Sequence, residues 1–426
     1  MPITLPTTWL PHYKIVIFDL DDTLAETSKL TKYRDIIFSA KASYAQDLKD
    51  DLVKHNIRPF SGISEVIRAI RERNPGVRLV TLTRAPKLYA NTVLHHILPS
   101  IPFDLVIGFE DCKAKSGKYL GKPHPNVVNL LVEKFGVKDR KDVVIIGDDN
   151  TDIECGMRSG IRTISVEFTG RVNYRTRDKF PDSTATSTQN LLNILAQPDI
   201  FLPPMERSNL DIGTVDNSFY TFNCFVPFPD SIEDESTREF VEKLRQNPVS
   251  IKVVSYSRYY KSKIGSYADL HPQTVVIKSK HTADFEIPDA WADAVTKMIE
   301  SYFNYPPDII TVVPSKSGQE KRMEKLLPMI EKRLESIPKY ANCKYLEDLI
   351  EIDAAMGSNK SKGHAERLIQ TQKHLKINPK YDVQNKRILV VDDVLTTGST
   401  FYWIKKKLLS KNPAVVLFFA ISRATP

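Results

Sequence analysis

The stretch "IVIFDLDDTL", residues 15–24, indicates which fold to expect for the first half of the chain. A short apolar run with the pattern of a buried strand is followed directly by Asp19 and Asp21. In open α/β sheets ligands bind beyond the carboxyl ends of the strands, so we expect both carboxylates to face one crevice. Two carboxylates this close favour Mg²⁺, because a hard cation takes oxygen ligands and relieves their mutual repulsion.

Further apolar runs alternate with amphipathic helical patterns in this half, such as "ISEVIRAIRERN" (63–74). Strands rich in Val, Ile and Leu and separated by helices predict a parallel sheet that is covered on both faces. The runs that we expect to be strands are "KIVIFDL" (14–20), "VRLVTLT" (77–83), "FDLVIGF" (103–109), "DVVIIGD" (142–148) and "IRTISVEF" (161–168).

Polar residues suited to phosphate and metal follow several of these predicted strands. Thr83 closes "LVTLT" and offers a hydroxyl and an amide, and Lys122 in "GKPHP" supplies a cation. The run "IIGDDNTD" then brings Asp148, Asp149 and Asp152, which are carboxylates suited to Mg²⁺. Phosphoryl transfer depends mainly on positioning and charge neutralisation, and these groups supply both.

These elements, in this order, resemble the haloacid dehalogenase-like phosphatase superfamily over about residues 13–197. The resemblance implies that Asp19 is the nucleophile and forms an aspartyl-phosphate. It implies that Asp21 is the general acid and base, while Thr83 and Lys122 hold the transferring phosphoryl group. Because Asp21 is present, we expect a phosphatase and not a dehalogenase.

The same resemblance implies a Mg²⁺ site. Asp148 would bind the ion together with Asp19 and the backbone carbonyl of Asp21, and Asp149 or Asp152 would complete the acidic shell. A small cap of two or three helices is expected at about residues 25–60. A cap of this size suits a small phosphate ester or an exposed phosphate on a larger molecule, and the sequence leaves both open.

The second half of the chain contains "RILVVDDVLTTGST", residues 387–400, with the same organisation. An apolar strand ends in Asp392 and Asp393, and a hydroxyl-rich turn leads into a predicted helix. Amides at a helix N-terminus bind phosphate, and Gly398 allows the backbone to approach it closely. Because the two acids suit the vicinal hydroxyls of a ribose, the stretch predicts a site for a ribose 5-phosphate.

This stretch resembles the signature of type I phosphoribosyltransferases, which bind 5-phosphoribosyl 1-pyrophosphate (PRPP) with Mg²⁺. Among their subgroups the competence-protein F type is the most similar. The resemblance implies that Asp392 and Asp393 contact the ribose. It implies that the 5-phosphate is bound by Thr396, Thr397, Gly398, Ser399 and Thr400.

Two further segments fall where that family binds pyrophosphate. Ser315 and Lys316 follow the predicted strand "DIITVVP" (308–314), where they form either a pyrophosphate loop or an ordinary helix cap with a solvated lysine. The run 359–380 has six Lys or Arg residues and one Glu. It is either a solvated helix face or a loop that closes over the pyrophosphate.

The predicted organisation is therefore α/β with two Rossmann-like domains. The first, residues 1–197, is the phosphatase domain with its cap, and residues 198–210 are a proline-containing linker. The second, residues 211–426, is the phosphoribosyltransferase domain. It would consist of a variable hood at about 211–290 and a core at about 291–426. The stretch "YSRYYKSK" (255–262) is expected to be an exposed edge strand in preference to a base-stacking surface.

Composition narrows the class of protein. The 426 residues suit two or three domains, and the charge of +8 is spread evenly, with +4 in 1–200 and +4 in 201–426. A dedicated nucleic-acid surface is therefore not favoured. The absence of long apolar runs and of a signal-peptide pattern predicts no membrane contact. Four scattered cysteines predict a reducing, cytoplasmic setting.

Our leading hypothesis is a bifunctional protein of nucleotide or ribose-phosphate metabolism. It would combine a Mg²⁺-dependent phosphatase with a PRPP-binding phosphoribosyltransferase, and both would act on phosphorylated small molecules. One alternative is a phosphatase regulated by a non-catalytic domain that senses PRPP or a nucleotide. Another, less favoured, is a phosphatase acting on nucleic-acid ends. The sequence does not decide between a monomer and an oligomer.

Overall fold

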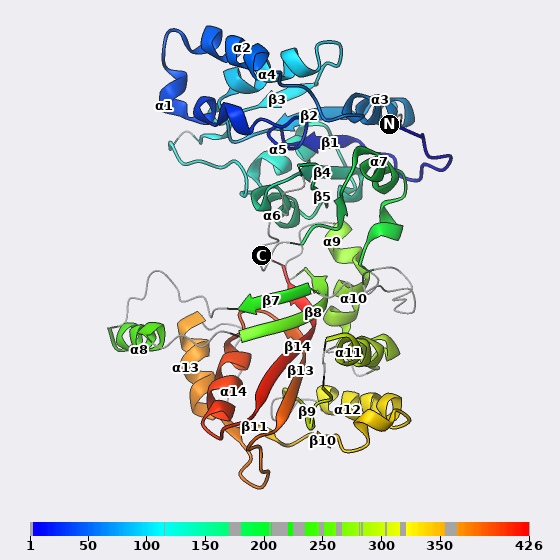
Figure 1. Ribbon diagram of the computed structural model, residues 1–426, viewed down its shortest axis with the longest axis vertical. Helices are drawn as coiled ribbons and strands as arrows, with labels where there is room; N and C mark the ends of the chain where they lie inside the picture. Colours follow the sequence, from blue (N-terminus) through cyan, green and yellow to red (C-terminus); the bar gives the residue numbers. More distant parts are fainter. Residues whose placement is uncertain are drawn as a thin grey trace. The chain divides into compact units, whose positions relative to one another are not determined.

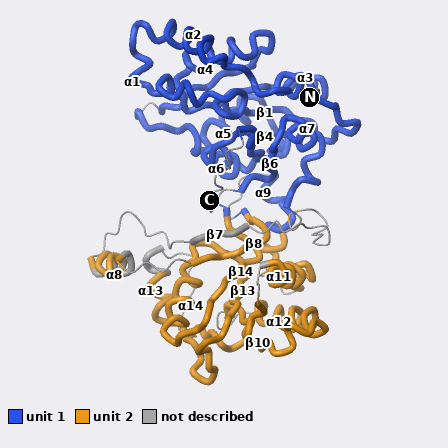
Figure 2. Tube along the Cα trace, in the orientation of Figure 1, with its two compact units in different colours: residues 1–203, 260–274, 425–426 blue, residues 204–259, 275–424 orange. Residues whose placement is uncertain are grey.

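The structure is a computed structural model. It describes residues 3–114, 116–169, 180–203, 206, 220–224, 235–246, 251–260, 266–280, 282, 284–302, 305–315, 321–353 and 364–425. Contacts divide the chain into two compact units, which Figure 2 colours separately. Unit 1 comprises residues 1–203, 260–274 and 425–426, and unit 2 comprises residues 204–259 and 275–424.

Unit 1 is built on a six-stranded sheet with the order β3-β2-β1-β4-β5-β6, in which every neighbouring pair is parallel (Figure 1). This confirms the parallel sheet predicted from the apolar runs. The strand β6 follows residues outside the described part and was not predicted. The strands are β1 (Ile15–Phe18), β2 (Arg78–Leu82), β3 (Leu105–Ile107), β4 (Val143–Gly147), β5 (Arg162–Val166) and β6 (Ser183–Ala185).

Helices cover both faces of this sheet, because alternate side chains of a strand point to opposite sides. Val16 and Phe18 of β1 pack into a core with α2 (Tyr44–Lys54), α3 (Ile63–Arg73), α4 (Lys87–Ile97) and α7 (Thr188–Ala196). Ile15 and Ile17 pack on the other face with α5 (Asn126–Lys134) and α6 (Asn150–Ser159). The near-continuous apolar character of β1 follows from this double burial.

The strand order places a crevice between β1 and β4. From β1 the chain adds β2 and β3 on one side, and then crosses to add β4, β5 and β6 on the other. Such a reversal opens a ligand crevice at the carboxyl ends of the two central strands. Asp19 and Asp148 directly follow β1 and β4, so the fold brings them to this point.

The predicted cap segment contains helices, as the sequence indicates. A 3₁₀ helix η1 (Ser28–Arg34) leads into the one-turn α1 (Ile36–Ser39) and then α2. Asp35 caps α1, with its carboxylate accepting from the amides of Ile37 and Phe38. Ile37 is 86% exposed, which sets it apart from the buried apolar residues of α2.

Unit 2 has a second six-stranded sheet, with the order β10-β9-β13-β14-β8-β7 (Figure 1). All neighbouring pairs are parallel except β7 and β8, which are antiparallel. The strands are β7 (Tyr220–Cys224), β8 (Ile251–Tyr259), β9 (Ile309–Val312), β10 (Lys344–Leu346), β13 (Arg387–Leu395) and β14 (Val415–Ala424). An antiparallel pair lies apart, β11 (Ile350–Ile352) with β12 (Leu375–Ile377).

One face of this sheet packs in a common core with α11 (Asp289–Tyr302) and α12 (Arg322–Leu334). On α14 (Ser399–Leu409), the ring of Phe401 contacts that of Phe418 in β14 at a centroid distance of 4.7 Å.

The remaining helices described in the two units are α8 (Glu235–Gln246), α9 (Ser266–Leu270), α10 (Pro272–Ser279) and α13 (His364–His374). Short 3₁₀ helices lie at Glu110–Cys112, Arg140–Asp142, Pro198–Phe201 and Pro338–Tyr340.

Two expectations for the second half need correction. β7 and β8, which come from the segment expected to form a hood, pair into the same sheet as the predicted core strands. β8 is also not an exposed edge strand, because it lies between β14 and β7. Arg258 in β8 is fully buried and ion-paired with the buried Glu206, so it is no exposed gatekeeper. None of the described helices is long and apolar enough to cross a membrane.

Candidate active site

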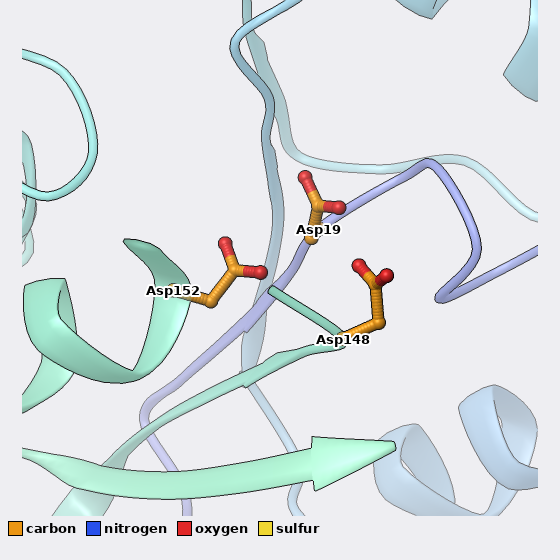
Figure 3. A group of neighbouring side chains, drawn as sticks. All are labelled: Asp19, Asp148 and Asp152. Atoms are coloured by element: carbon orange, nitrogen blue, oxygen red, sulfur yellow. The ribbon is translucent and has the colours of Figure 1, made fainter. Parts of the chain in front are cut away.

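Three carboxylates converge at the carboxyl end of the unit 1 sheet (Figure 3). Asp19 follows β1, Asp148 follows β4 and Asp152 lies in the first turn of α6. One oxygen of each lies within 4.8 Å of the others. The structure therefore brings together three residues that are widely separated in the sequence.

Local structure fixes each member of this cluster. The Asp19 amide donates to the Ile146 carbonyl at 2.8 Å, which extends the pairing of β1 with β4 up to the site. Asp149 is the N-cap of α6, and it forms a capping box in which its own amide donates to Asp152 Oδ2 at 3.1 Å. A Cβ on Gly147 would lie 2.2 Å from that oxygen, so only glycine fits there.

Lys122 joins two of the acids. Its Nζ lies 2.5 Å from Asp19 Oδ1 and 2.5 Å from Asp152 Oδ1, and its side chain is 3% exposed. Burial disfavours the charged ammonium, but the carboxylates of Asp152 and Asp19 outweigh it and hold the pKa of Lys122 above its ordinary value. The buried cation is thus kept charged beside the predicted nucleophile.

The acidic group fits a divalent cation. Burial, followed by the negative charges of Asp19 and Asp152, raises the pKa of Asp148 to about 8. Burial also raises the pKa of Asp152 to about 7, against the opposing effect of Lys122. Crowded carboxylates of this kind are stabilised as anions by a hard cation with oxygen ligands, and Mg²⁺ meets that description.

Asp21 is surrounded by donors. Its Oδ1 accepts from the Tyr89 hydroxyl at 2.6 Å and from the Thr27 hydroxyl at 2.6 Å, and it lies 3.2 Å from Arg34 Nε. Burial nevertheless raises the pKa of Asp21, with Arg34 opposing the rise. A carboxyl group with a raised pKa is suited to donate a proton to a leaving group.

Thr83 and Asp149 also make local hydrogen bonds that the sequence did not predict. The Thr83 amide donates to the Ile107 carbonyl at 3.0 Å, so this amide is engaged in the sheet and not directed at a phosphate. The Thr83 hydroxyl oxygen accepts from the Ala85 amide at 3.1 Å, which leaves its own hydrogen to donate. Asp149 Oδ1 accepts from the Thr151 amide at 2.7 Å and serves the helix cap.

A cavity of about 820 Å³ opens over these groups. Its volume is in the range of ligand-binding pockets. Asp19, Asp21, Thr83, Lys122 and Asp148 all line it. Residues of the cap and of the loops after β2 and β3 also line the cavity, among them Arg34, Ile37, Arg84, Phe109 and Tyr119.

The second predicted site lies on unit 2. Asp392 and Asp393 are the sixth and seventh residues of β13, which continues two residues further than predicted. The Asp393 amide donates to Asp392 Oδ1 at 2.8 Å, and Lys280 Nζ lies 2.6 Å from Asp393 Oδ2. Burial, followed by the charge of Asp393, raises the pKa of Asp392 well above its usual range.

The predicted phosphate loop leads from β13 into α14. Gly398 has a left-handed φ of +80°, which favours glycine, and it precedes the helix that begins at Ser399 and includes Thr400. The hydroxyls of Thr397 and Ser399 lie 3.0 Å apart. The Arg423 guanidinium donates to the Thr396 carbonyl. The turn and helix start expected from the sequence are thus present.

Of the predicted pyrophosphate segment, the structure describes Ser315, which follows β9. In unit 2 the strand order reverses between β9 and β13, so the residues that follow β9 share a crevice position with Asp392. The hydroxyl of Ser315 donates to Glu324 Oε2 at 3.0 Å, and Lys316 lies outside the described residues. Of the basic run 359–380, the described part forms α13, β12 and the residues after it.

Several residues of the unit 1 site were not predicted. Tyr89, Thr27 and Arg34 surround Asp21, and no pattern in the sequence relates Tyr89, 68 residues away, to it. Arg84 directly follows Thr83, so its position beside a strand end was a usable signal. The role of the cap in holding Asp21 needed the folded structure.

Comparison with known proteins finds a family match within unit 1. Residues 31–166 match the family model of haloacid dehalogenase-like hydrolases. A pyrophosphatase of Halalkalibacterium halodurans is 24% identical over 214 residues, which is 42% of this chain and 95% of that protein. A phosphoglycolate phosphatase of Aquifex aeolicus is 23% identical over 217 residues, 43% of this chain and 96% of that protein.

Solved structures are similar over the same share of the chain. The protein CbbY of Rhodobacter sphaeroides, in complex with phosphate, is 18% identical with a TM-score of 0.30, and covers 42% of this chain and 96% of its own. A hydrolase of the same superfamily, subfamily IA, from Geobacter sulfurreducens is 15% identical with a TM-score of 0.31, and covers 44% of this chain and 98% of its own.

Proposed function

Because unit 1 contains a haloacid dehalogenase-like hydrolase domain, we propose that it is a Mg²⁺-dependent phosphatase acting through an aspartyl-phosphate. The observation that carries this proposal is the buried contact of Lys122 with Asp19 inside a cavity that also holds Asp148. A charged lysine beside a carboxylate nucleophile neutralises charge where a phosphoryl group would be transferred.

In the first step the Asp19 carboxylate attacks phosphorus, and the bond from phosphorus to the leaving oxygen breaks. Asp21, whose raised pKa favours the protonated form, gives its proton to that oxygen. In the second step Asp21 takes a proton from water as the water attacks the phosphorus. The bond to Asp19 breaks, and inorganic phosphate leaves. The Thr83 hydroxyl and Lys122 hold the phosphoryl oxygens throughout.

Asp19 and Asp148, with the backbone carbonyl of Asp21, would hold the Mg²⁺. When bound, the ion supplies charge neutralisation for the phosphoryl oxygens and the crowded acids. Asp152 is proposed to act chiefly on Lys122, because its Oδ1 contacts the ammonium and its Oδ2 completes the helix cap. Asp149 lines the cavity and would add its negative charge to this acidic group.

A phosphatase screen of nucleotides and sugar phosphates tests this proposal. We expect the wild type to release phosphate in the presence of Mg²⁺ and to lose this activity with EDTA. Asp19→Asn should lower kcat by roughly 10⁴-fold or more, because the nucleophile is lost. Asp50→Asn, an exposed acid on α2, is the matched control and should retain activity. Equal activity of wild type and Asp19→Asn would refute the proposal.

For unit 2 we propose a PRPP-binding domain with phosphoribosyltransferase activity, which would make the protein bifunctional in nucleotide or ribose-phosphate metabolism. The position of Asp392 and Asp393 beside the reversal of strand order supports this, as does the left-handed Gly398 before α14. The two acids would hold the ribose hydroxyls, and the loop 396–400 would hold the 5-phosphate.

The ion pair of Lys280 with Asp393 favours a second candidate, a domain that senses PRPP or a nucleotide without turnover. A lysine that is ion-paired with Asp393 competes with Mg²⁺ for that carboxylate. The same ion pair does not occupy the loop 396–400, which would still bind phosphate. Titration with PRPP, followed by measurement of pyrophosphate release, separates the two candidates. Saturable binding without release supports the sensor, and absence of binding to the wild type contradicts both.

A further inference from the structure

We infer that Tyr89 is a positioning residue for the reaction of unit 1. Its hydroxyl holds Oδ1 of Asp21, so that Oδ2 is the oxygen that passes the proton to the leaving group. The inference rests on the phosphatase proposed above. It adds the atom of Asp21 that acts and the residue that orients it.

The hydrogen-bond donors around Asp21 meet one of its two carboxyl oxygens. Oδ1 accepts from the Tyr89 and Thr27 hydroxyls, each at 2.6 Å, and it lies 3.2 Å from Arg34 Nε. Among the described residues, no hydrogen bond reaches Oδ2. Because Asp21 lines the cavity, Oδ2 is the oxygen of this carboxyl that remains for a ligand.

Tyr89 is fixed by the connection from β2 to α4. It is the third residue of α4, and its side chain is fully buried. The Thr83 amide donates to the Ile107 carbonyl at 3.0 Å, and the Ala85 amide donates to the Thr83 hydroxyl at 3.1 Å. The turn into α4 is therefore tied to the sheet, and the same connection carries both Thr83 and Tyr89.

The other two groups at Oδ1 come from the cap segment. Arg34 Nη2 donates to the Thr27 carbonyl at 2.9 Å and to the Thr27 hydroxyl at 2.7 Å, and Thr27 is fully buried. These two residues therefore hold each other as well as Asp21. Of the described donors to Oδ1, Tyr89 alone lies outside the cap segment, so it is the contact that ties Asp21 to the sheet and its helices.

Hydrogen bonds on one oxygen are enough to orient a carboxyl group. The terminal torsion of an aspartate is broad, so a carboxyl without partners turns and exchanges its two oxygens. Donors on Oδ1 oppose this rotation and keep Oδ2 directed to the same place. Orientation of a reacting group lowers the barrier of the step in which it acts.

The same hydrogen bond stabilises the charge that forms on Asp21 in the first step. As the bond from Asp19 to phosphorus forms, the leaving oxygen departs with the electron pair of its bond to phosphorus and takes the proton from Asp21 Oδ2. Asp21 thereby becomes a carboxylate, and hydrogen bonds to a carboxylate are stronger than those to a neutral acid. The Tyr89 hydroxyl therefore stabilises the transition state more than the ground state.

The test compares two kinds of leaving group on the full chain. The first ester is the best primary alkyl phosphate among the nucleotides and sugar phosphates of the screen above, since its alkoxide needs the proton. The second is p-nitrophenyl phosphate, because p-nitrophenolate is weakly basic and leaves without a proton. The readout is the ratio of kcat/KM for the alkyl ester to kcat/KM for p-nitrophenyl phosphate. Tyr89→Phe should lower this ratio by about 10- to 100-fold, because a hydrogen bond to a charged group is lost.

Two comparisons separate positioning from a structural role. Tyr33→Phe is the matched control, because Tyr33 is also fully buried and its hydroxyl donates to Asp51 at 2.8 Å, while neither residue lines the cavity. This variant should leave the ratio unchanged. Asp21→Asn has no proton to give, so adding Tyr89→Phe to it should not lower the ratio further, because a positioning residue acts only through the residue that it orients.

The outcomes distinguish this inference from the phosphatase proposal. Hydrolysis of p-nitrophenyl phosphate that depends on Asp19, with an unchanged ratio in Tyr89→Phe, would overturn the inference and leave the phosphatase intact. An equal fall in kcat/KM for both esters, or a further fall of the ratio in the Asp21→Asn background, would show a structural role and would also overturn it. No Asp19-dependent hydrolysis of any of these phosphates would overturn both.

Discussion

Replacement of Lys122 by Met should strongly destabilise unit 1. The lysine is 3% exposed and lies 2.5 Å from both Asp19 and Asp152, so its removal leaves two buried carboxylates without their cation. Removal of one partner from a buried ion pair costs about 3–5 kcal/mol. A matched control is Lys141→Met, because Lys141 pairs with Asp139 at 3.1 Å but is 59% exposed. Exposed pairs contribute about 0–1 kcal/mol.

Amide hydrogen exchange of β4 measures this cost within unit 1, without requiring that the whole chain unfold in one step. At pH 8.5 without metal, the β4 amides of Lys122→Met should exchange about 10²- to 10³-fold faster, or more, than those of the wild type. The rates are compared within each pH, since intrinsic exchange changes with pH. Lys141→Met should change the rates by less than about fivefold.

The size of the effect should depend on pH. Asp152 and Asp148 have folded-state pKa values raised to about 7 and about 8. A raised folded-state pKa means that the folded state still holds a proton that the unfolded state has released. The stability that this proton contributes is therefore present at low pH and is lost as pH rises through those pKa values. The loss caused by Lys122→Met should therefore be smaller at pH 6. If Lys122→Met and Lys141→Met behave alike at pH 8.5, the buried bridge is not a stabilising feature and this reasoning is wrong.

Three other changes have expected outcomes. Gly108→Ala should destabilise unit 1 by about 1–3 kcal/mol in a denaturation experiment, because the new Cβ meets the Lys87 backbone, and a neutral result would show that the turn yields. Tyr89→Phe removes a hydrogen-bond donor to Asp21, so the pKa of Asp21 should rise further. The alkaline limb of the pH profile of kcat/KM should therefore move to higher pH. An alkaline limb at the wild-type pH would exclude a role of this hydrogen bond. The hydrogen-bonded guanidinium of Arg387 lowers the pKa of Asp308 to about 2. The stability that this pair contributes should therefore be present above about pH 4 and be lost as pH falls toward 2. In thermal melts at pH 5 and pH 3, Arg387→Gln should show a smaller difference between the two pH values than the wild type.

Much of the secondary structure of unit 1 follows from local pattern. The five predicted strands are present, each shorter by one or two residues at either end. The helix predicted at 63–74 begins at Ile63 and ends at Arg73. Runs of Val, Ile and Leu mark strands that are buried on both faces, so their composition alone identifies them. β6, with the sequence Ser-Thr-Ala, contains no Val, Ile or Leu, so composition does not identify it as a strand.

The second half shows where local pattern is insufficient. The sequence of β8 indicates a strand, but its place between β14 and β7 depends on pairing with residues far along the chain. Basic and aromatic residues in "YSRYYKSK" indicate an exposed edge. The burial of Arg258 depends on Glu206, which no short-range pattern links to it. A buried arginine has the same sequence appearance as an exposed one.

Local patterns identify which residues follow the strand ends, since apolar runs followed by acids are local features. Asp19, Asp148 and the acids of β13 could be selected on that basis. Which of these groups meet depends on the folded chain, because Lys122 lies 103 residues from Asp19 in the sequence and 2.5 Å from it in space. The fold also lets Asp152 contact Lys122 with one carboxylate oxygen and accept from the N-cap amide of α6 with the other. It places Arg84 in the lining of the cavity. Contacts between distant segments depend on how the sheet is ordered, and strand order leaves no trace in the composition of any single strand.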